Sequence, residues 1–340
     1  MEAMPLVSII TPVYKSEEFI KESILSIMNQ TYKNIELICI NDCTPDNSFE
    51  ICKELSQQYS NIKLCENEKN MGQEVTRNRG IDEASGKYIL FFDSDDILDP
   101  QTVEKLVEAA EAENSNVVFF TYSRIINGIE KPVVLEGIPE GNIPTEEFSK
   151  LIYDILYIGD LSCIGTKLYK TEFINENGIR FDKKYKYNED GAFFINTLFK
   201  TDYICVVNEP YYKYIIRTEG STMTSYRKDM FVSVSKTREL IKKLFLLNGC
   251  WSDSSKKIEY FREMLALMLN SLINEEKFGT AKSFKETCVK IREYIDFDEM
   301  YECLVKSGKL TTVQKIILSM IQMKKWVVVR MLVKVYLIMK

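Results

Sequence analysis

Apolar runs and amphipathic stretches alternate along the first 120 residues of the chain. Between the runs, apolar residues recur at the spacing of a helix face near residues 17–30, 46–58, 73–85 and 100–113. The runs are short enough for buried strands: VSIITPV (7–13), IELICIND (35–42), IKLCEN (62–67), KYILFFD (87–93) and NVVFFTY (116–122). The alternation predicts an α/β fold with a mainly parallel sheet and helices on both faces.

The pattern changes twice further along the chain. Residues 123–165 contain several Gly and Pro, which predicts a hairpin and an irregular connection. Two apolar runs near 203–207 and 211–216 could extend the sheet, and after Tyr226 helical patterns cover roughly 227–247, 254–276 and 280–294. We therefore expect one α/β domain over 1–225, with halves 1–122 and 123–225, a helical region over 226–308 and a tail over 309–340.

Polar residues gather where three of the expected strands end. Thr11 to Tyr14 end the first strand, Asn41 and Asp42 the second, and Asp93 to Asp96 the fourth. In an open parallel sheet, ligands bind beyond the carboxyl ends of the strands. The sequence therefore predicts a ligand site at this edge.

The segment KYILFFDSDD carries the most specific chemistry. If strand geometry persists, Asp93 and Asp95 point the same way and can converge on one cation. Carboxylate oxygens favour Mg2+ or Mn2+. Alternatively, the acids only open a loop, and for Asp99 followed by Pro100 we favour a helix start.

Composition narrows the chemistry further. A 340-residue chain with 45% hydrophobic residues can form about two domains. Nine cysteines without a CxxC pair predict reduced, packed thiols and a cytosolic compartment, and the first residues lack the pattern of a signal peptide. The chain has no histidine, which excludes Ser-His-Asp triads, Cys-His pairs and His-ligated zinc. Acid-base catalysis would therefore fall mainly to carboxylates.

Charge is distributed unevenly. The formal net charge is −6, but residues 309–340 hold seven Lys and Arg and no acid, so the remainder carries −13. The acidic body argues against nucleic-acid binding. The basic, apolar tail is too interrupted by charge to span a bilayer and predicts a helix lying on an anionic membrane. The alternative is a helix docked on the acidic body or on a partner.

Several segments together resemble the family 2 glycosyltransferases of the GT-A, Rossmann-like fold, especially bacterial enzymes of capsular, exopolysaccharide or lipopolysaccharide synthesis. The resemblance covers about residues 5–225. It rests on VSIITPVYKSEEFIKESILSIMNQTY, INDCTPDNS, NMGQEVTRNRGIDEASGKYILFFDSDD, KLYK, YNEDGAFF and YYKYIIRTEGSTMT, in family order and at similar spacing.

The resemblance implies roles for particular residues. Asp42 would bond the uracil of a UDP-sugar, with Thr11, Pro12 and Tyr14 lining the base pocket. Arg77 would lie near the nucleotide, or else form a salt bridge on its own helix. Asp93, Ser94 and Asp95 match the DXD motif, with Asp93 toward ribose or metal and Asp95 holding the cation on the diphosphate. Arg217 and Ser221 match an element near the pyrophosphate.

Asp190 resembles the catalytic base of the family. The same residue could instead cap the helix that GAFFINTLF forms, and Glu189 and Asp182 are other acids within reach. A single displacement assisted by this base would invert the anomeric centre. The implied enzyme is a Mn2+- or Mg2+-dependent transferase, moving a sugar from a UDP-sugar to a glycan or lipid-linked glycan at the inner face of the cell membrane.

Two other functions remain open from the sequence. A sugar-nucleotide nucleotidyltransferase also uses acids at a strand end, but it usually has a Gly-rich, basic loop where this chain has TPVYKSEEF. A catalytically silent, membrane-associated scaffold would need to have lost its chemistry, whereas Asp42, Asp93, Asp95 and Asp190 are all present. Which sugar is transferred, to which acceptor, and the oligomeric state are not encoded in these motifs.

Overall fold

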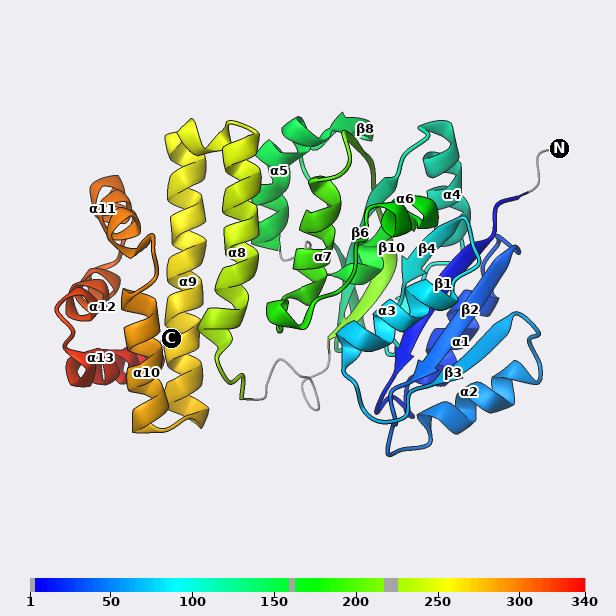
Figure 1. Ribbon diagram of the computed structural model, residues 1–340, viewed down its shortest axis with the longest axis horizontal. Helices are drawn as coiled ribbons and strands as arrows, with labels where there is room; N and C mark the ends of the chain where they lie inside the picture. Colours follow the sequence, from blue (N-terminus) through cyan, green and yellow to red (C-terminus); the bar gives the residue numbers. More distant parts are fainter. Residues whose placement is uncertain (1–3, 159–162, 217–225, 340) are drawn as a thin grey trace. The chain divides into compact units, whose positions relative to one another are not determined.

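A computed structural model describes residues 4–158, 163–216 and 226–339 (Figure 1). The chain divides into two compact units, Met1–Lys183 with Glu189–Thr218, and Lys184–Asn188 with Glu219–Lys340. Each unit is described by itself. No helix in the described ranges is long and apolar enough to cross a membrane.

The first unit is built on one mixed sheet, whose strands follow the order β3-β2-β1-β4-β9-β6-β10-β5, with β7 beside β6 and β8 beside β10. β1 pairs in parallel with β2 and β4, whereas β9 is antiparallel to both β4 and β6. The strands are β1 (Val7–Val13), β2 (Ile35–Asn41), β3 (Ile62–Glu66), β4 (Tyr88–Phe91), β5 (Ile97–Leu98), β6 (Val117–Ile126), β7 (Ile129–Pro132), β8 (Gly141–Pro144), β9 (Lys167–Lys170) and β10 (Tyr203–Ile216).

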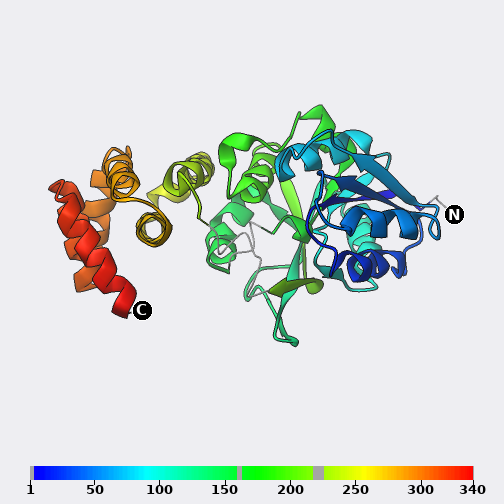
Figure 2. The same cartoon turned by 90° about the horizontal axis from the view of Figure 1, so that it is seen from below.

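Helices of this unit cover both faces of the sheet, as expected (Figure 2). The helices are α1 (Ile20–Met28), α2 (Ser48–Ser56), α3 (Gln73–Glu83), α4 (Thr102–Ala112), α5 (Thr145–Ile158), α6 (Thr171–Glu176) and α7 (Glu189–Leu198). Alternate strand residues serve opposite faces: Phe92 joins the core beneath α1, α2 and α4, whereas Phe91 packs edge-on against Phe193 of α7. Gly80 of α3 lies against Ile10 of β1 on that second face.

The structure confirms the predicted class and corrects local details. Residues 123–165 do contain a hairpin, β6 with β7, and an irregular connection over 133–140, but they also contain β8 and the helix α5, which were not predicted. The two apolar runs at 203–207 and 211–216 form one strand, β10, with a register shift between Val207 and Tyr212. All nine cysteines are free thiols, as predicted.

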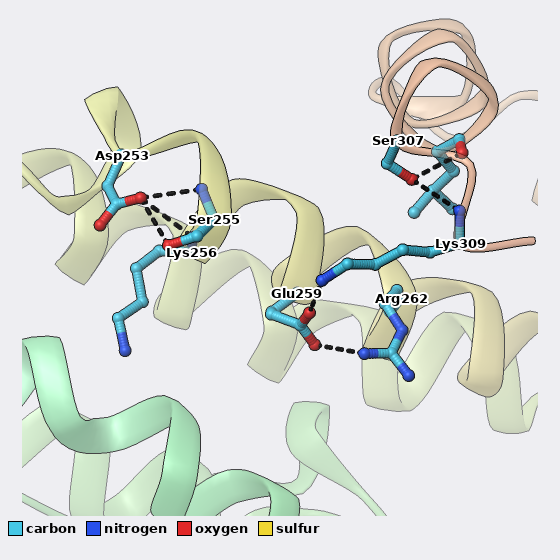
Figure 3. A network of polar contacts seen from close by, with 8 residues as sticks. Asp253, Ser255, Lys256, Glu259, Arg262, Ser307 and Lys309 are labelled. Atoms are coloured by element: carbon cyan, nitrogen blue, oxygen red, sulfur yellow. Dashed lines mark hydrogen bonds and ion pairs between the residues drawn. The ribbon is translucent and has the colours of Figure 1, made fainter.

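The described part of the second unit is helical. Its helices are α8 (Met230–Leu247), α9 (Ser254–Phe278), α10 (Ala281–Arg292), α11 (Phe297–Ser307), α12 (Thr312–Gln322) and α13 (Trp326–Met339). The sequence pattern missed α11 and gave the tail one helix where the structure has two. Asp253 begins α9 by accepting the backbone N–H groups of Ser255 and Lys256 (Figure 3).

Candidate active site

Three parallel strands bring their polar ends to one edge of the sheet. Because β1 lies between β2 and β4 and runs parallel to both, their carboxyl ends point the same way. Tyr14, Asp42 and Asp93 follow these three strands within two residues. The predicted gathering of strand ends is therefore present in the fold.

The residues expected to line a base pocket differ in exposure. Thr11 is fully buried, Pro12 is also buried within β1, and the Thr11 hydroxyl has no hydrogen-bond partner in the described residues. Tyr14, directly after the strand, leaves 42% of its surface exposed. Of these three, Tyr14 is the side chain that can stack on a ligand.

Asp42 organises the loop before α3. Its Oδ1 accepts the Met71 N–H at 2.7 Å and the Asn67 amide at 2.9 Å, and its Oδ2 accepts the Gly72 N–H at 2.9 Å. Gly72 has a φ of +89°, a conformation that suits glycine. An ionised carboxylate offers about four acceptor positions, so Oδ2 retains one for a ligand N–H.

The DSDD segment is a turn rather than an extension of the strand. β4 ends at Phe91, and the Asp96 N–H donates to the Asp93 carbonyl at 3.3 Å. Strand geometry does not persist beyond Phe91, so it does not direct Asp93 and Asp95 toward one cation. Exposure still alternates, since Asp93 and Asp95 are partly exposed and Ser94 and Asp96 are buried.

Asp96 has a structural role that the sequence did not separate from the other acids. The Tyr212 hydroxyl donates to its Oδ2 at 2.6 Å, and the Ile215 N–H donates to its Oδ1 at 3.0 Å. Burial, together with the charges of Asp95 and Asp93, raises the pKa of Asp96 well above its usual range. Asp96 thus fastens the turn to β10. Asp99 was expected at the N-cap of the next helix. Its Oδ1 accepts the Gln101 N–H at 3.1 Å, but Gln101 is the N-cap and α4 begins at Thr102, two residues later than predicted.

Arg77 lies between two acids from distant parts of the chain. Its Nη1 donates to Asp190 Oδ1 at 2.6 Å and its Nη2 donates to Asp93 Oδ1 at 2.8 Å. The guanidinium is buried and also lies over the Phe181 ring. Burial lowers the pKa of Arg77, but Asp190 and Asp93 outweigh it and the pKa is raised. Arg77 does form a salt bridge, but across elements rather than along its own helix.

Asp190 lies in the first turn of α7, with 17% of its side chain exposed. Burial, together with the charges of Glu189 and Asp93, raises its pKa to about 8 against the opposing charge of Arg77. A carboxyl group with a pKa near the working pH suits general-base catalysis. Burial also raises the pKa of Glu189, whereas Asp182 is exposed.

Lys167 is a buried cation that sequence reasoning missed. Its ammonium donates to the Cys163 carbonyl at 2.5 Å and lies over the rings of Phe119 and Phe194. Its charge also helps to lower the pKa of Asp190. The only available signal was a lysine inside the apolar KLYK strand.

Arg217 and Ser221 lie outside the described residues.

Comparison with known proteins identifies the framework around these residues. Residues 8–170 match the family model "Glycosyl transferase family 2". The chain is 28% identical over 339 residues to a cholesterol galactosyltransferase of Borreliella burgdorferi, covering 94% of this chain and 92% of the relative. It is 29% identical to a poly(ribitol-phosphate) beta-glucosyltransferase of Bacillus spizizenii, covering 64% of this chain and 33% of that relative.

The fold has a close counterpart among solved structures. The crystal structure of Staphylococcus aureus TarS 1–349 in complex with UDP-GlcNAc aligns with a TM-score of 0.65 at 20% identity, over 97% of this chain and 91% of that chain. This likeness shows the GT-A fold, in agreement with the resemblance found in the sequence motifs. The chain is a glycosyltransferase, and its residues 8–170 match family 2.

Proposed function

We propose that this enzyme moves a sugar from a UDP-sugar to a hydroxyl of a glycan or lipid-linked glycan in bacterial surface polysaccharide synthesis, with inversion and with a divalent cation. The observation that carries the proposal is the bridge through Arg77. It places Asp190, the candidate base, one guanidinium away from Asp93, the first acid of the candidate donor site.

The donor would bind at the edge where β1, β2 and β4 end. Tyr14 offers an exposed ring for the base, and Asp42 Oδ2 retains an acceptor position for its N–H. The TarS complex contains UDP-GlcNAc in the same fold, which supports a nucleotide-sugar donor. Arg217 and Ser221 remain proposed pyrophosphate contacts.

Asp95 and Asp93 would hold Mn2+ or Mg2+ together with oxygens of the diphosphate. The described residues contain no cluster of three or more candidate metal ligands. This fits a cation that takes one or two carboxylates and completes its shell with phosphates and water. When bound, the cation supplies positive charge for the departing diphosphate, which Asp93 and Asp95 would otherwise repel.

Asp190 would accept the proton of the acceptor hydroxyl as this oxygen attacks the anomeric carbon. The C–O bond to the diphosphate breaks as the new glycosidic bond forms, and UDP leaves. Arg77 donates to Asp190 Oδ1 at 2.6 Å and would hold this carboxylate in place. A single displacement converts an α-linked donor into a β-linked product. We place the reaction at the inner face of the cell membrane, where a lipid-linked acceptor would be presented.

UDP release in Mn2+ with a panel of UDP-sugars tests the proposal, comparing the wild type with Asp95→Ala and Asp190→Asn. Slow hydrolysis of one donor, lost in both variants, supports a transferase and identifies its sugar. UDP that fails to bind with Mn2+ contradicts the proposal, and release of pyrophosphate instead of UDP points to a nucleotidyltransferase. An α linkage retained in the product rules out inversion.

A further inference from the structure

Helix α13 is apolar on two opposite faces. At the helical spacing of about 100° per residue, Val329 and Val333 lie on one side, and both are fully buried. Val327, Val328, Met331 and Val335 lie on the other side, and 70% of Val327 and 61% of Met331 remain exposed. A surface helix normally has one apolar face and one polar face, so the outward apolar face needs an explanation.

The inward face accounts for how the tail is held. α13 packs against α9, α10 and α12 of the same unit. Arg330 bonds Glu276 of α9, and Lys334 pairs with the same carboxylate at 3.4 Å. Lys309, at the beginning of the tail, pairs with Glu259 of α9 at 2.7 Å (Figure 3). The tail is therefore docked on its own unit, which was the alternative left open by the sequence, and the outward face is not used for this docking.

Exposed lysines lie close to α13 in the sequence. Lys324 and Lys325 form the exposed turn that leads into α13, next to the exposed Met323. Lys315 is exposed beside Ile316, whose surface is 41% exposed, on α12. No ion pair to an acid is found for these three lysines in the described ranges, and residues 309–340 contain no acid. An apolar face bordered by cations is the chemistry of an interfacial helix on anionic lipid.

We propose that the outward face of α13, formed by Val327, Val328, Met331 and Val335, inserts into the surface of an anionic bilayer while Lys324 and Lys325 meet the lipid headgroups. This inference rests on the proposed function, which places the enzyme at the membrane, and it assigns the membrane contact to one face of α13. A second copy of the chain fits less well, because residues 309–340 contain no acid and the tail of a partner copy would offer Lys324 and Lys325 no opposite charge.

The experiment measures co-sedimentation of the full chain with vesicles of phosphatidylcholine containing phosphatidylglycerol, and with pure phosphatidylcholine vesicles. We expect binding to the anionic vesicles that falls as salt rises. The double variant Lys324→Glu/Lys325→Glu should weaken this binding by at least about thirtyfold, since each lysine near the surface contributes roughly fivefold. Met331→Glu should weaken it by about tenfold or more. Ile129→Glu, which changes an exposed isoleucine of β7, is the matched control and should bind as the wild type does.

Tryptophan emission and UDP release provide two further tests of membrane insertion. Trp326 lies on the inward side of α13, so Trp326→Phe/Val327→Trp moves the indole to the outward face, and anionic vesicles should blue-shift the tryptophan emission of this variant and not of the wild type. UDP release should be the same in Met331→Glu and the wild type, which separates failure of this inference from failure of the proposed reaction. Equal binding of wild type and Met331→Glu to vesicles would overturn it. So would a dimer in solution that Met331→Glu dissociates without any vesicle binding by the wild type.

Discussion

Arg77 Nη1 lies 2.6 Å from Asp190 Oδ1, although the two residues are 113 positions apart in the chain. The contact joins α3, in the half of the sheet expected to bind the nucleotide, to α7, which carries the candidate base. Because the second Nη of the same guanidinium bonds Asp93, a displacement of either acid is transmitted to the other. The proposed donor site and the proposed base are thus linked through one guanidinium.

Replacing Arg77 tests this coupling. Arg77→Lys offers one compact ammonium in place of a planar fork, so it cannot bond both acids in the same geometry. We expect kcat to fall more than the KM for the donor, because positioning of the base is lost. Arg77→Met should also lower the free energy of unfolding by about 3 kcal/mol, since it leaves acids without their cation. Steady-state kinetics and urea denaturation measure the two effects.

Arg79→Lys is the matched control for Arg77. Arg79 lies two residues further along α3 and bonds the Asn67 amide oxygen at 3.0 Å in a more exposed position. Its replacement should change stability by less than about 1 kcal/mol and leave kcat unchanged. Similar effects of the two Lys substitutions would show that Arg77 has no special position.

The pH profile reports on Asp190. A base acts in its deprotonated form, and burial raises the pKa of Asp190 from its ordinary value to about 8. We therefore expect kcat/KM to rise with pH and to level off above about pH 8. Asp190→Asn should reduce kcat by roughly 10²–10⁴-fold at every pH. Asp182→Asn, at an exposed neighbouring acid, should keep the wild-type profile. A profile flat between pH 6 and 9 in the wild type would remove Asp190 from this role.

Asp42 and Tyr14 are both proposed to contact the base of the donor, but only Asp42 also has a structural role, and one variant of each residue shows the difference. Asp42→Asn places an amide N–H group against N–H donors of Met71, Gly72 or Asn67, and should lower the free energy of unfolding by about 1–3 kcal/mol. Tyr14→Ala should leave stability within about 0.5 kcal/mol and weaken UDP binding, because its exposed ring is expected to stack on the base. Calorimetric titration with UDP and thermal melts distinguish the two. Unchanged UDP affinity in Tyr14→Ala would exclude stacking.

Gly80 sets the approach of α3 to the sheet. A Cβ there would lie 2.2 Å from Ile10 Cγ2 and 2.9 Å from Ile40 Cδ1. Gly80→Ala should therefore lower the free energy of unfolding, since overpacking costs about 1–3 kcal/mol and outweighs a helix-propensity gain of about 1 kcal/mol. Gln73→Ala, at an exposed position of the same helix, is the control and should be nearly neutral. Stabilisation by Gly80→Ala in denaturant melts would contradict the close packing.

Local patterns were sufficient for much of the fold because they report directly on burial. β1, β2 and α3 lie within a few residues of their predicted ranges, and the periodicity that marks them is a property of each segment alone. α5 was missed because its helical pattern follows directly on a stretch of Gly and Pro, which was given too much weight. β4 ends at Phe91, before its predicted end at residue 93, because the chain turns there. α1 begins at Ile20, after its predicted start near residue 17, because a turn comes before it.

The site was less predictable because long-range pairing decides which polar residues do what. Asp93, Asp95 and Asp96 look equivalent in the sequence. Contacts with Tyr212, which is 116 residues away, and with the Ile215 N–H make Asp96 a buried anchor. Likewise, the sequence pattern predicts that Arg77 lies on a helix, but only the packing of α3 beside α7 brings its guanidinium to Asp190. Such partners are fixed by topology and leave no periodic signal in either segment.

The anchoring of Asp96 has a consequence for any attempt to transplant this chemistry. The four letters DSDD do not by themselves define a cation site, because the shape of their turn is held by a phenol and a backbone amide from β10. Moving the tetrapeptide to the end of a strand in another protein would carry over the charges and lose their arrangement. The turn is held together with Tyr212 and the β10 backbone at residue 215, so the unit that keeps its shape is discontinuous in the chain.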